Sequence, residues 1–371
     1  MSLLRLRQYL YFDWWDSTYA GISSSIIEAM DMQTLLAWRA TNRGNYMNVC
    51  KELRGSLEQL LSDFVPSPAA LLLLLTRTHA LLSGELAICY ILRDASLEPR
   101  SLEIFVGSVW FDEFIDSFGT SSELSGYQLD WWLTTHVDRH VETRHVTNSL
   151  HIPLSTGGSI IIHAAASTSP CHAIACSPSS LGTTFITEYS FATAYPRLTF
   201  SRRAIVCWDL LAEGSPHEQL MYDRLRTNGF SFEEDPTVWP EYSSEWCSNY
   251  AHPHLACLRS TYLCPQQGRY FGDRGSMVCF MDTLAVDFAM LKDRCIPPYG
   301  IMAAWRLPSN LVCYAQCNDF DDLLAPGILV TSIKFENESF RPTVRQDNMP
   351  RKHTNASVSI GHSGRIRSVT L

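Results

Sequence analysis

The sequence predicts an α/β protein of the α+β kind, with a mixed sheet, N-terminal helices and a loop-rich C-terminal module. The first observation is a helical repeat of apolar residues, which recur every three or four positions at Cys50, Leu53, Leu57, Leu60 and Phe64. The second is a set of short apolar runs at 80–82, 102–106 and 160–163, which are typical of buried strands. The third is a series of turn-forming pairs after about residue 214, such as Asp235-Pro236.

Helices and strands are expected to alternate in the N-terminal half. Helices are predicted over 22–42 and over the amphipathic segment that ends at Phe64. Ser67 is expected to cap a third helix, because Pro68 follows at the first helical position and an apolar run comes next. The elements that follow are a strand at 80–82, a helix over 85–92, a strand at 102–106 and a helix over 109–118.

Regular structure is expected to be sparser in the second half. The predicted core continues with a strand over 140–146, a central strand at 160–163, a helix over 179–191 and a helix or strand over 203–211. Short antiparallel strands are expected at 300–306, 311–316 and 328–335. The chain is thereby divided into a helical region (1–66), a core (67–213), a loop-rich module (214–340) and a basic flexible tail (341–371).

Composition restricts the classes of partner. The 371 residues carry a formal net charge of −9, which disfavours general nucleic-acid binding because phosphate affinity depends on Lys and Arg. Only the segment from Arg341 onward, with six Lys or Arg and one Asp, suits nucleic acid or an acidic partner. The longest apolar run, Ala69–Leu75, is far shorter than the ~20 residues of a membrane span. With no secretory signal, the 12 cysteines are expected to be reduced in a cytoplasmic or nuclear protein.

A candidate site follows from the predicted strands. Ser83-Gly84 joins a strand to a helix, and alternation places Ser101 and Glu103 on one face of the next strand. Residues from about 67 to 200 resemble a large group of uncharacterised fungal proteins with a nucleotidyltransferase-like core. The resemblance is carried by Ser83-Gly84-Glu85-Leu86-Ala87, Pro99-Arg100-Ser101-Leu102-Glu103-Ile104-Phe105-Val106, Thr193–Thr199 and Gly272–Ser276.

The resemblance implies a fold in which the usual chemistry is depleted. In active nucleotidyltransferases, a Gly-Ser turn at a helix N-terminus holds phosphates, and an Asp-x-Asp pair with a third acid binds two metals. Here Ser101 and Glu103 occupy the pair, and no acid lies between Gly157 and Pro170, where the third is expected. A carboxylate at Glu85 would repel a phosphate. The site formed by Ser83, Gly84, Glu85, Ser101 and Glu103 is therefore expected to be degenerate.

Several functions remain open at this point. The leading hypothesis is a non-catalytic protein that acts by binding a protein partner, with no cofactor. The alternative is an active metal-dependent enzyme in which Asp112 or Glu113 joins Glu103. A third is a ubiquitin-ligase adaptor, because residues 26–42 resemble the second half of an F-box. Ser83-Gly84 is also compatible with an ordinary strand-to-helix turn in which serine caps the helix.

Two groups of residues suggest metal ligands. Thiolates and imidazoles, the ligands that Zn²⁺ prefers, are concentrated at Cys247, His252, His254, Cys257 and Cys264. Their spacing matches no recognised zinc finger, so ordinary core and loop positions are the alternative. A second group of histidines and acids is compatible with a metal site or with an exposed edge, and comprises His136, His140, His145, Asp130, Asp138 and Glu142.

Overall fold

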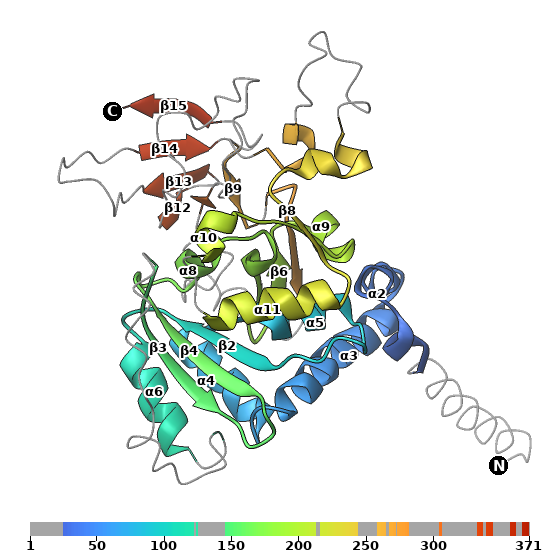
Figure 1. The fold of residues 1–371 in the computed structure, drawn as a ribbon, viewed down its shortest axis with the longest axis vertical. Coiled ribbons are helices and arrows are strands. Elements are labelled where there is room, and N and C mark those ends of the chain that lie inside the picture. Colours follow the sequence, from blue (N-terminus) through green and yellow to red (C-terminus); the bar gives the residue numbers. More distant parts are fainter. Residues whose placement is uncertain are drawn as a thin grey trace, which may run out of the picture.

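The structure, a computed structural model, describes residues 25–121, 124, 145–212, 216–243, 258–264, 267–271, 273–281, 304–305, 332–336, 339–343, 357–360 and 366–370. Its centre is a seven-stranded mixed sheet with the strand order β10-β6-β5-β1-β2-β4-β3 (Figure 1). The strands are β1 (Leu81–Ser83), β2 (Ser101–Val106), β3 (Val146–Pro153), β4 (Ser159–Ala165), β5 (Thr184–Ile186), β6 (Ser190–Thr193) and β10 (Met277–Phe280).

The three strands expected at 80–82, 102–106 and 160–163 are neighbours in this sheet, as predicted. β2 lies between β1 and β4, antiparallel to β1 and parallel to β4. Glu103 pairs with Ser83 on one side and with Ile161 on the other. The register therefore brings the Ser83-Gly84 turn next to the middle of β2.

Alternation along β2 separates a core face from a polar face. Leu102 and Ile104 are fully buried in the main hydrophobic cluster, as expected from the pattern. Because side chains alternate, Ser101 and Glu103 point to the other face. The same rule places Ile162 of β4 in the main cluster and His163 on the face of Glu103.

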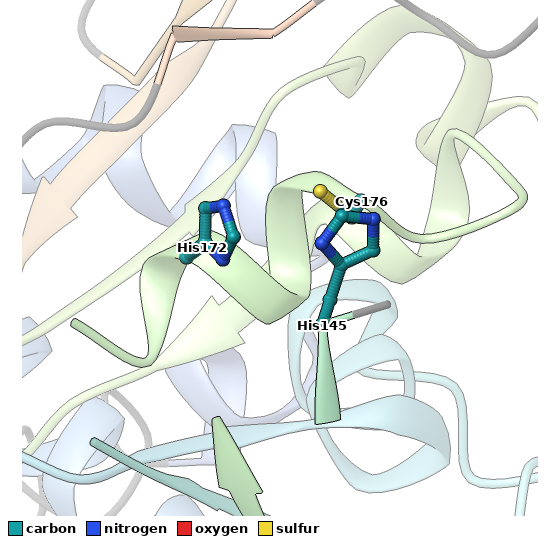
Figure 2. Close-up of side chains that lie close together, drawn as sticks. All are labelled: His145, His172 and Cys176. Atoms are coloured by element: carbon teal, nitrogen blue, oxygen red, sulfur yellow. The ribbon is translucent and has the colours of Figure 1, made fainter. Parts of the chain in front are cut away.

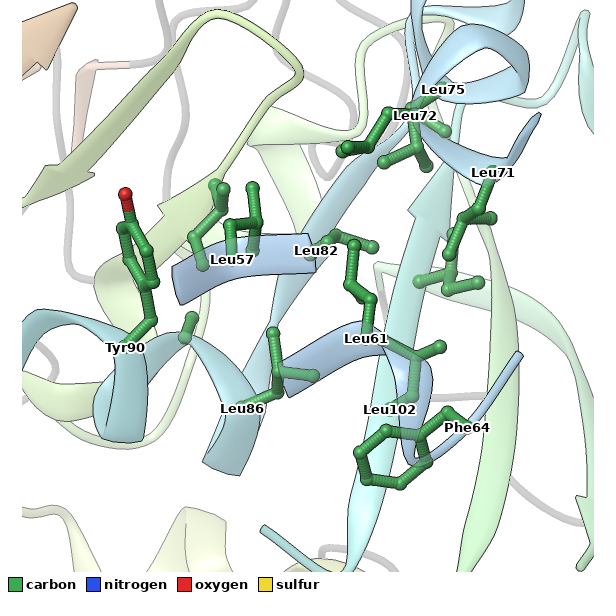
Figure 3. Packing of buried hydrophobic residues seen from close by; sticks show 14 of the residues in the cluster. Leu57, Leu61, Phe64, Leu71, Leu72, Leu75, Leu82, Leu86, Tyr90 and Leu102 are labelled. Carbon is green, nitrogen blue, oxygen red and sulfur yellow. The ribbon is translucent and has the colours of Figure 1, made fainter. Parts of the chain in front are cut away.

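Helices from the N-terminal half cover the core face. They are α2 (Met32–Arg39), α3 (Arg43–Ser62), α4 (Pro68–Thr78) and α6 (Phe111–Thr120). Figure 3 shows Leu57 and Leu61 of α3 and Leu71 of α4 packed with residues of the sheet and of the helix that follows β1. Leu61, rather than the expected Leu60, is the fully buried position at this end of α3.

Side-chain caps start three of these helices. Asp31 accepts a hydrogen bond from the Thr34 amide at 2.8 Å, and Asn42 accepts one from the Asn45 amide at 2.9 Å. Ser67 caps α4 through the Ala70 amide at 3.4 Å, with proline at the first helical position. The cap predicted from Ser67-Pro68 is thus confirmed, because the serine oxygen satisfies an amide that has no partner within the helix.

Helix α5 (Gly84–Leu92) begins at the end of β1 and is buried on all sides from Gly84 to Ile91. Leu86, Tyr90 and Ile91 belong to the main cluster. Cys89 was expected to pack with them. It lies instead in a separate hydrophobic cluster on the other side of α5, together with residues of α11 (Pro216–Thr227). Apart from Glu85, α5 is apolar all round, which is typical of a helix enclosed between two layers. Figure 1 shows α11 crossing in front of α5.

One prediction for the second half is wrong. Residues 179–191 do not form one helix: a short 3-10 turn, η2 (Leu181–Thr183), precedes β5 and β6. The region expected to be loop-rich after 214 also contains the twelve-residue helix α11. Strands on both sides of position 213 share the central sheet, since β10 pairs with β6.

The polar face of the sheet is covered by later segments. Short helices α8 (Cys171–Ala175) and α9 (Pro196–Phe200) contribute to a second hydrophobic cluster with Phe185 and Trp305. A two-stranded parallel sheet is formed by β7 (Arg203–Ile205) and β8 (Ser231–Glu233), and α10 (Trp208–Ala212) leads towards α11. Shorter elements between β8 and β10 are η3 (Pro236–Val238), η4 (Pro240–Tyr242), η6 (Leu258–Thr261) and β9 (Arg269–Tyr270).

The C-terminal strands form two further sheets. β11 (Ala304–Trp305), within the expected strand 300–306, pairs with β9. An antiparallel sheet contains β12 (Ser332–Glu336), β13 (Ser339–Thr343), β14 (Ser357–Ile360) and β15 (Ile366–Thr370), so the segment expected as a flexible tail includes strands. The strand predicted at 311–316 lies outside the described residues. Among the described helices, none combines the length and the apolar character needed to cross a membrane.

Candidate functional site

The site begins at the turn between β1 and α5. Gly84 has φ +68°, a left-handed conformation that favours glycine. A Cβ atom at this position would lie 2.3 Å from Oε1 of Glu103 and 2.9 Å from Oε2. The absence of a side chain at Gly84 therefore lets the first turn of α5 approach the Glu103 carboxylate directly.

Two imidazoles flank this carboxylate. Nε2 of His163, on β4, lies 3.9 Å from Oε2 of Glu103, and Nε2 of His217, in the first turn of α11, lies 3.5 Å from Oε1. The Glu103 side chain is 12 % exposed, and those of His163 and His217 are 18 % and 27 % exposed. The three groups form a partly enclosed cluster between the sheet and α11.

The strands also fix the ring of His163. The Ser149 hydroxyl of β3 lies 2.8 Å from Nδ1 of His163, within hydrogen-bond distance. The ring stacks on Phe105 of β2, with 4.6 Å between ring centroids. Both neighbours follow from the register, in which His163 pairs with Ser149 on one side and Phe105 on the other. Nε2 is consequently the ring nitrogen that is directed at Glu103.

Burial and neighbouring charges shift the pKa values of the cluster in opposite directions. Burial raises the pKa of Glu103, but the neighbouring imidazoles of His217 and His163 bring it below its ordinary value. Burial lowers the pKa of His163 to about 4 despite the nearby Glu103 carboxylate. Burial, reinforced by the charge of Glu103, raises the pKa of Glu218 to about 7. At neutral pH, Glu103 is therefore ionised and His163 is neutral.

The two serines of the predicted site lie inside the sheet. Ser83 occupies the N-cap position of α5 but makes no cap: its hydroxyl donates to the Thr184 carbonyl of β5 at 2.6 Å. The alternative in which Ser83 caps the helix is therefore wrong, although the turn itself joins strand to helix as expected. Ser101 is fully buried on the polar face of β2. Both serines are integrated into the interior of the sheet.

Glu85 has a structural partner at the start of α5. Its Oε1 accepts from Nε of Arg224 at 3.1 Å, and its Oε2 accepts from Nη2 at 3.0 Å. The backbone amide of Arg100 donates to Oε2 at 2.8 Å. The Glu85 side chain is 4 % exposed, so its negative charge is matched by a bidentate guanidinium from α11 and by an amide. The Glu85–Arg224 ion pair thereby holds α11 against the turn between β1 and α5, where an active nucleotidyltransferase would bind phosphates.

The two acids that the active-enzyme alternative places beside Glu103 lie in another part of the fold. Asp112 and Glu113 are exposed in the first turn of α6. Glu113 pairs with Arg77 of α4 at 3.1 Å. The buried residues of α6, such as Phe114, belong to the main cluster on the opposite face of the sheet from Glu103. Neither acid is therefore placed to share a ligand with Glu103.

Of the five predicted zinc ligands, one lies within the described residues. Cys247, His252, His254 and Cys257 lie outside the described residues, and Cys264 is buried in the second hydrophobic cluster. In the other histidine group, His136, His140, Asp130, Asp138 and Glu142 also lie outside the described residues. His145 is described and lies directly before β3.

Sequence reasoning missed the two imidazoles of the Glu103 cluster and the adjacent Glu218, which we include in the cluster from here on. His163 could have been found once β2 and β4 were taken as neighbours, because alternation then places it on the face of Glu103. His217 and Glu218 follow Pro216, a favourable first helical residue. Buried Met221, Tyr222 and Leu225 recur at helical spacing behind them.

Comparison with protein-family models, with curated proteins and with solved structures finds no match for this chain.

Proposed function

We propose that this chain is a non-catalytic protein with a nucleotidyltransferase-like fold, and that it acts by binding a protein partner. The observation that carries the proposal is the environment of Glu103. Glu103 is the one acidic residue in the sequences of β1, β2 and β4, and the two side chains that pair with its carboxylate are imidazoles. Two-metal catalysis needs several oxygen ligands around a shared pair of cations.

The helix turn supports the same proposal. A phosphate bound at the N-terminus of α5 would need free amides and a favourable charge. Instead, Glu85 places a buried carboxylate in the first turn, and Arg224 anchors that carboxylate to α11. The net charge of −9 favours a protein over a nucleic acid as partner.

Calorimetric titration with Mg²⁺ and each nucleoside triphosphate tests the absence of a nucleotide site. No saturable binding is expected at ligand concentrations below about 1 mM, which corresponds to about 4 kcal/mol. Micromolar binding that is lost in Glu103→Gln and kept in Glu98→Gln would contradict the proposal. Glu98 is a suitable control because its side chain is exposed and pairs only with surface Arg100 among the described residues.

One observation favours an active enzyme as a second candidate. The carboxylates of Glu103 and Glu218 interact electrostatically, and perturbed acids beside histidines are common at active sites. In this alternative, Glu218 of α11 supplies the acid that β4 lacks. Metal-dependent nucleotide turnover abolished by both Glu103→Gln and Glu218→Gln would favour the enzyme, and no turnover in the unmodified protein would favour the binding protein.

A further inference from the structure

A second cluster of metal-binding side chains lies at the edge of the sheet, apart from Glu103. It contains His145, His172 and Cys176, and one ligand atom from each lies within 4.8 Å of the other two. It is the one group of three or more histidine, cysteine or acidic ligands that meets this distance in the part of the chain that the structure describes. Figure 2 shows the three side chains close together.

Local structure places these residues together. His172 belongs to α8 and Cys176 is its C-cap, so the two are four residues apart on one helical turn and share a face. His145 comes from the other side, directly before edge strand β3. Its carbonyl accepts from the Ala166 amide at 2.8 Å, which fixes it next to the end of β4 and the segment leading into α8.

The contact between the two imidazole rings and the burial of the three side chains are suited to metal ligands. The His145 and His172 rings meet edge to face, with 5.2 Å between centroids and 78° between planes. His172 is buried, whereas His145 and Cys176 are half-buried. The two imidazoles and the thiol therefore approach one another in a partly buried position.

We propose that His145, His172 and Cys176 form a zinc site. Two imidazole nitrogens and one thiolate are borderline-to-soft ligands that suit Zn²⁺ and not the hard cations Mg²⁺ or Ca²⁺. On binding, the Cys176 sulfhydryl loses its proton to solvent and forms the sulfur–metal bond. Water fills the fourth tetrahedral position. The ion joins the start of edge strand β3 to α8 and so acts as a staple, while its three protein ligands leave one coordination position open.

Cobalt substitution tests the site in the full-length chain, prepared without a metal-binding tag and stripped of metal. Co²⁺ should bind with a stoichiometry of one, give a near-ultraviolet thiolate charge-transfer band and tetrahedral visible bands, and be displaced by Zn²⁺. Cys176→Ser should abolish the charge-transfer band. His172→Asn should weaken Co²⁺ binding by more than about tenfold, because loss of even an outer-shell partner costs about 10–100-fold.

Matched variants separate this site from other thiols and histidines. Cys171→Ser alters a buried thiol of the same helix, and His151→Asn alters an exposed histidine of the same strand. Both should keep the band and the affinity. Cys257→Ser should keep them as well, because it removes a cysteine of the other group suggested by the sequence.

Several outcomes would overturn the zinc site. These are no saturable Co²⁺ binding by the unmodified chain, a charge-transfer band that survives Cys176→Ser, or a band lost in Cys171→Ser or Cys257→Ser. A measurement on the unmodified protein guards against variants that fail to fold. Zn²⁺ should raise the unfolding temperature and a chelator should reverse the rise, since a ligand that binds the native state stabilises it. An unchanged unfolding temperature at saturating Zn²⁺ would count against the staple.

Discussion

Two residues of the Glu103 cluster have opposite effects on how stability depends on pH. His163 has an ordinary pKa of 6.5 when unfolded and about 4 when folded, so between these values the folded state binds fewer protons. Glu218 changes from 4.5 to about 7, so over that range the folded state binds more protons. Stability rises with pH where the unfolded state binds more protons. His163 therefore makes stability rise between pH 4 and 6.5, and Glu218 makes it fall between pH 4.5 and 7.

Removing one residue of this pair should reveal the effect of the other. Relative to the unmodified protein, Glu218→Gln should add a rise in the free energy of unfolding of about 1 kcal/mol per pH unit near pH 5.5. His163→Gln should add a fall of similar size. Chemical denaturation at a series of pH values measures both slopes. Parallel curves for the two variants would show that the shifts assigned to these residues are wrong.

Gly84 combines a left-handed backbone angle with a close approach to Glu103. Gly84→Ala should lower the free energy of unfolding by about 2–4 kcal/mol, the sum of a left-handed alanine and of overlap with the Glu103 carboxylate. Gly157→Ala isolates the backbone contribution, because Gly157 has φ +86° and nothing within 4 Å of an added Cβ. That control should cost only about 1–2 kcal/mol. Equal losses in thermal unfolding for the two variants would exclude a close contact between Gly84 and Glu103.

At the scale of elements, the sequence specifies α5 more fully than its surroundings. A strand, Ser-Gly and an apolar helix are local signals, and they place Gly84 beside Glu103 as expected. The partners of α5 are not local. Arg224 lies 139 residues from Glu85, and no pattern near either residue indicates that they meet. His217 and Glu218 were missed for the same reason, and because α11 itself was not predicted.

The contact between α5 and α11 should contribute strongly to stability. Arg224→Met leaves the buried Glu85 carboxylate with the Arg100 amide as its remaining hydrogen-bond donor among the described residues, and should cost about 2–4 kcal/mol. Arg226→Met on the same helix should cost less than about 1 kcal/mol, because its pair with Asp223 is exposed. Urea denaturation compares the two variants. Similar midpoints would mean that the Glu85–Arg224 pair does not hold α11 in place.

A double-mutant cycle distinguishes loss of the pair from loss of packing. If the buried charge is the cause, Glu85→Gln should partly rescue Arg224→Met, because a neutral amide is less costly to leave without its guanidinium. Additive effects of the two substitutions would assign the destabilisation to the packing of the Arg224 side chain instead.

At the scale of the whole molecule, the sequence pattern predicted the central strands of the sheet but not how far the sheet extends. Alternation and apolar runs identified β1, β2 and β4. The edge strand β10 comes from a region dominated by turn signals, and its four residues carry no alternation that would mark them as part of the sheet. Its pairing with β6 spans more than 80 positions, from Thr193 to Met277, and is therefore set by tertiary packing rather than by local propensity.

The expected core, 67–213, should therefore fail to fold alone. It lacks α3, whose Leu53 and Leu57 are fully buried against the sheet, and it lacks α11 and β10. It also leaves the Glu85 carboxylate without Arg224. A fragment spanning 25–306 keeps these elements and Trp305, which is buried in the second cluster. Circular dichroism during heating should show a cooperative transition for 25–306 and none for 67–213, which should also bind a dye for exposed apolar surface. A sharp transition for 67–213 near that of the longer fragment would show that the flanking helices and β10 are dispensable for the sheet.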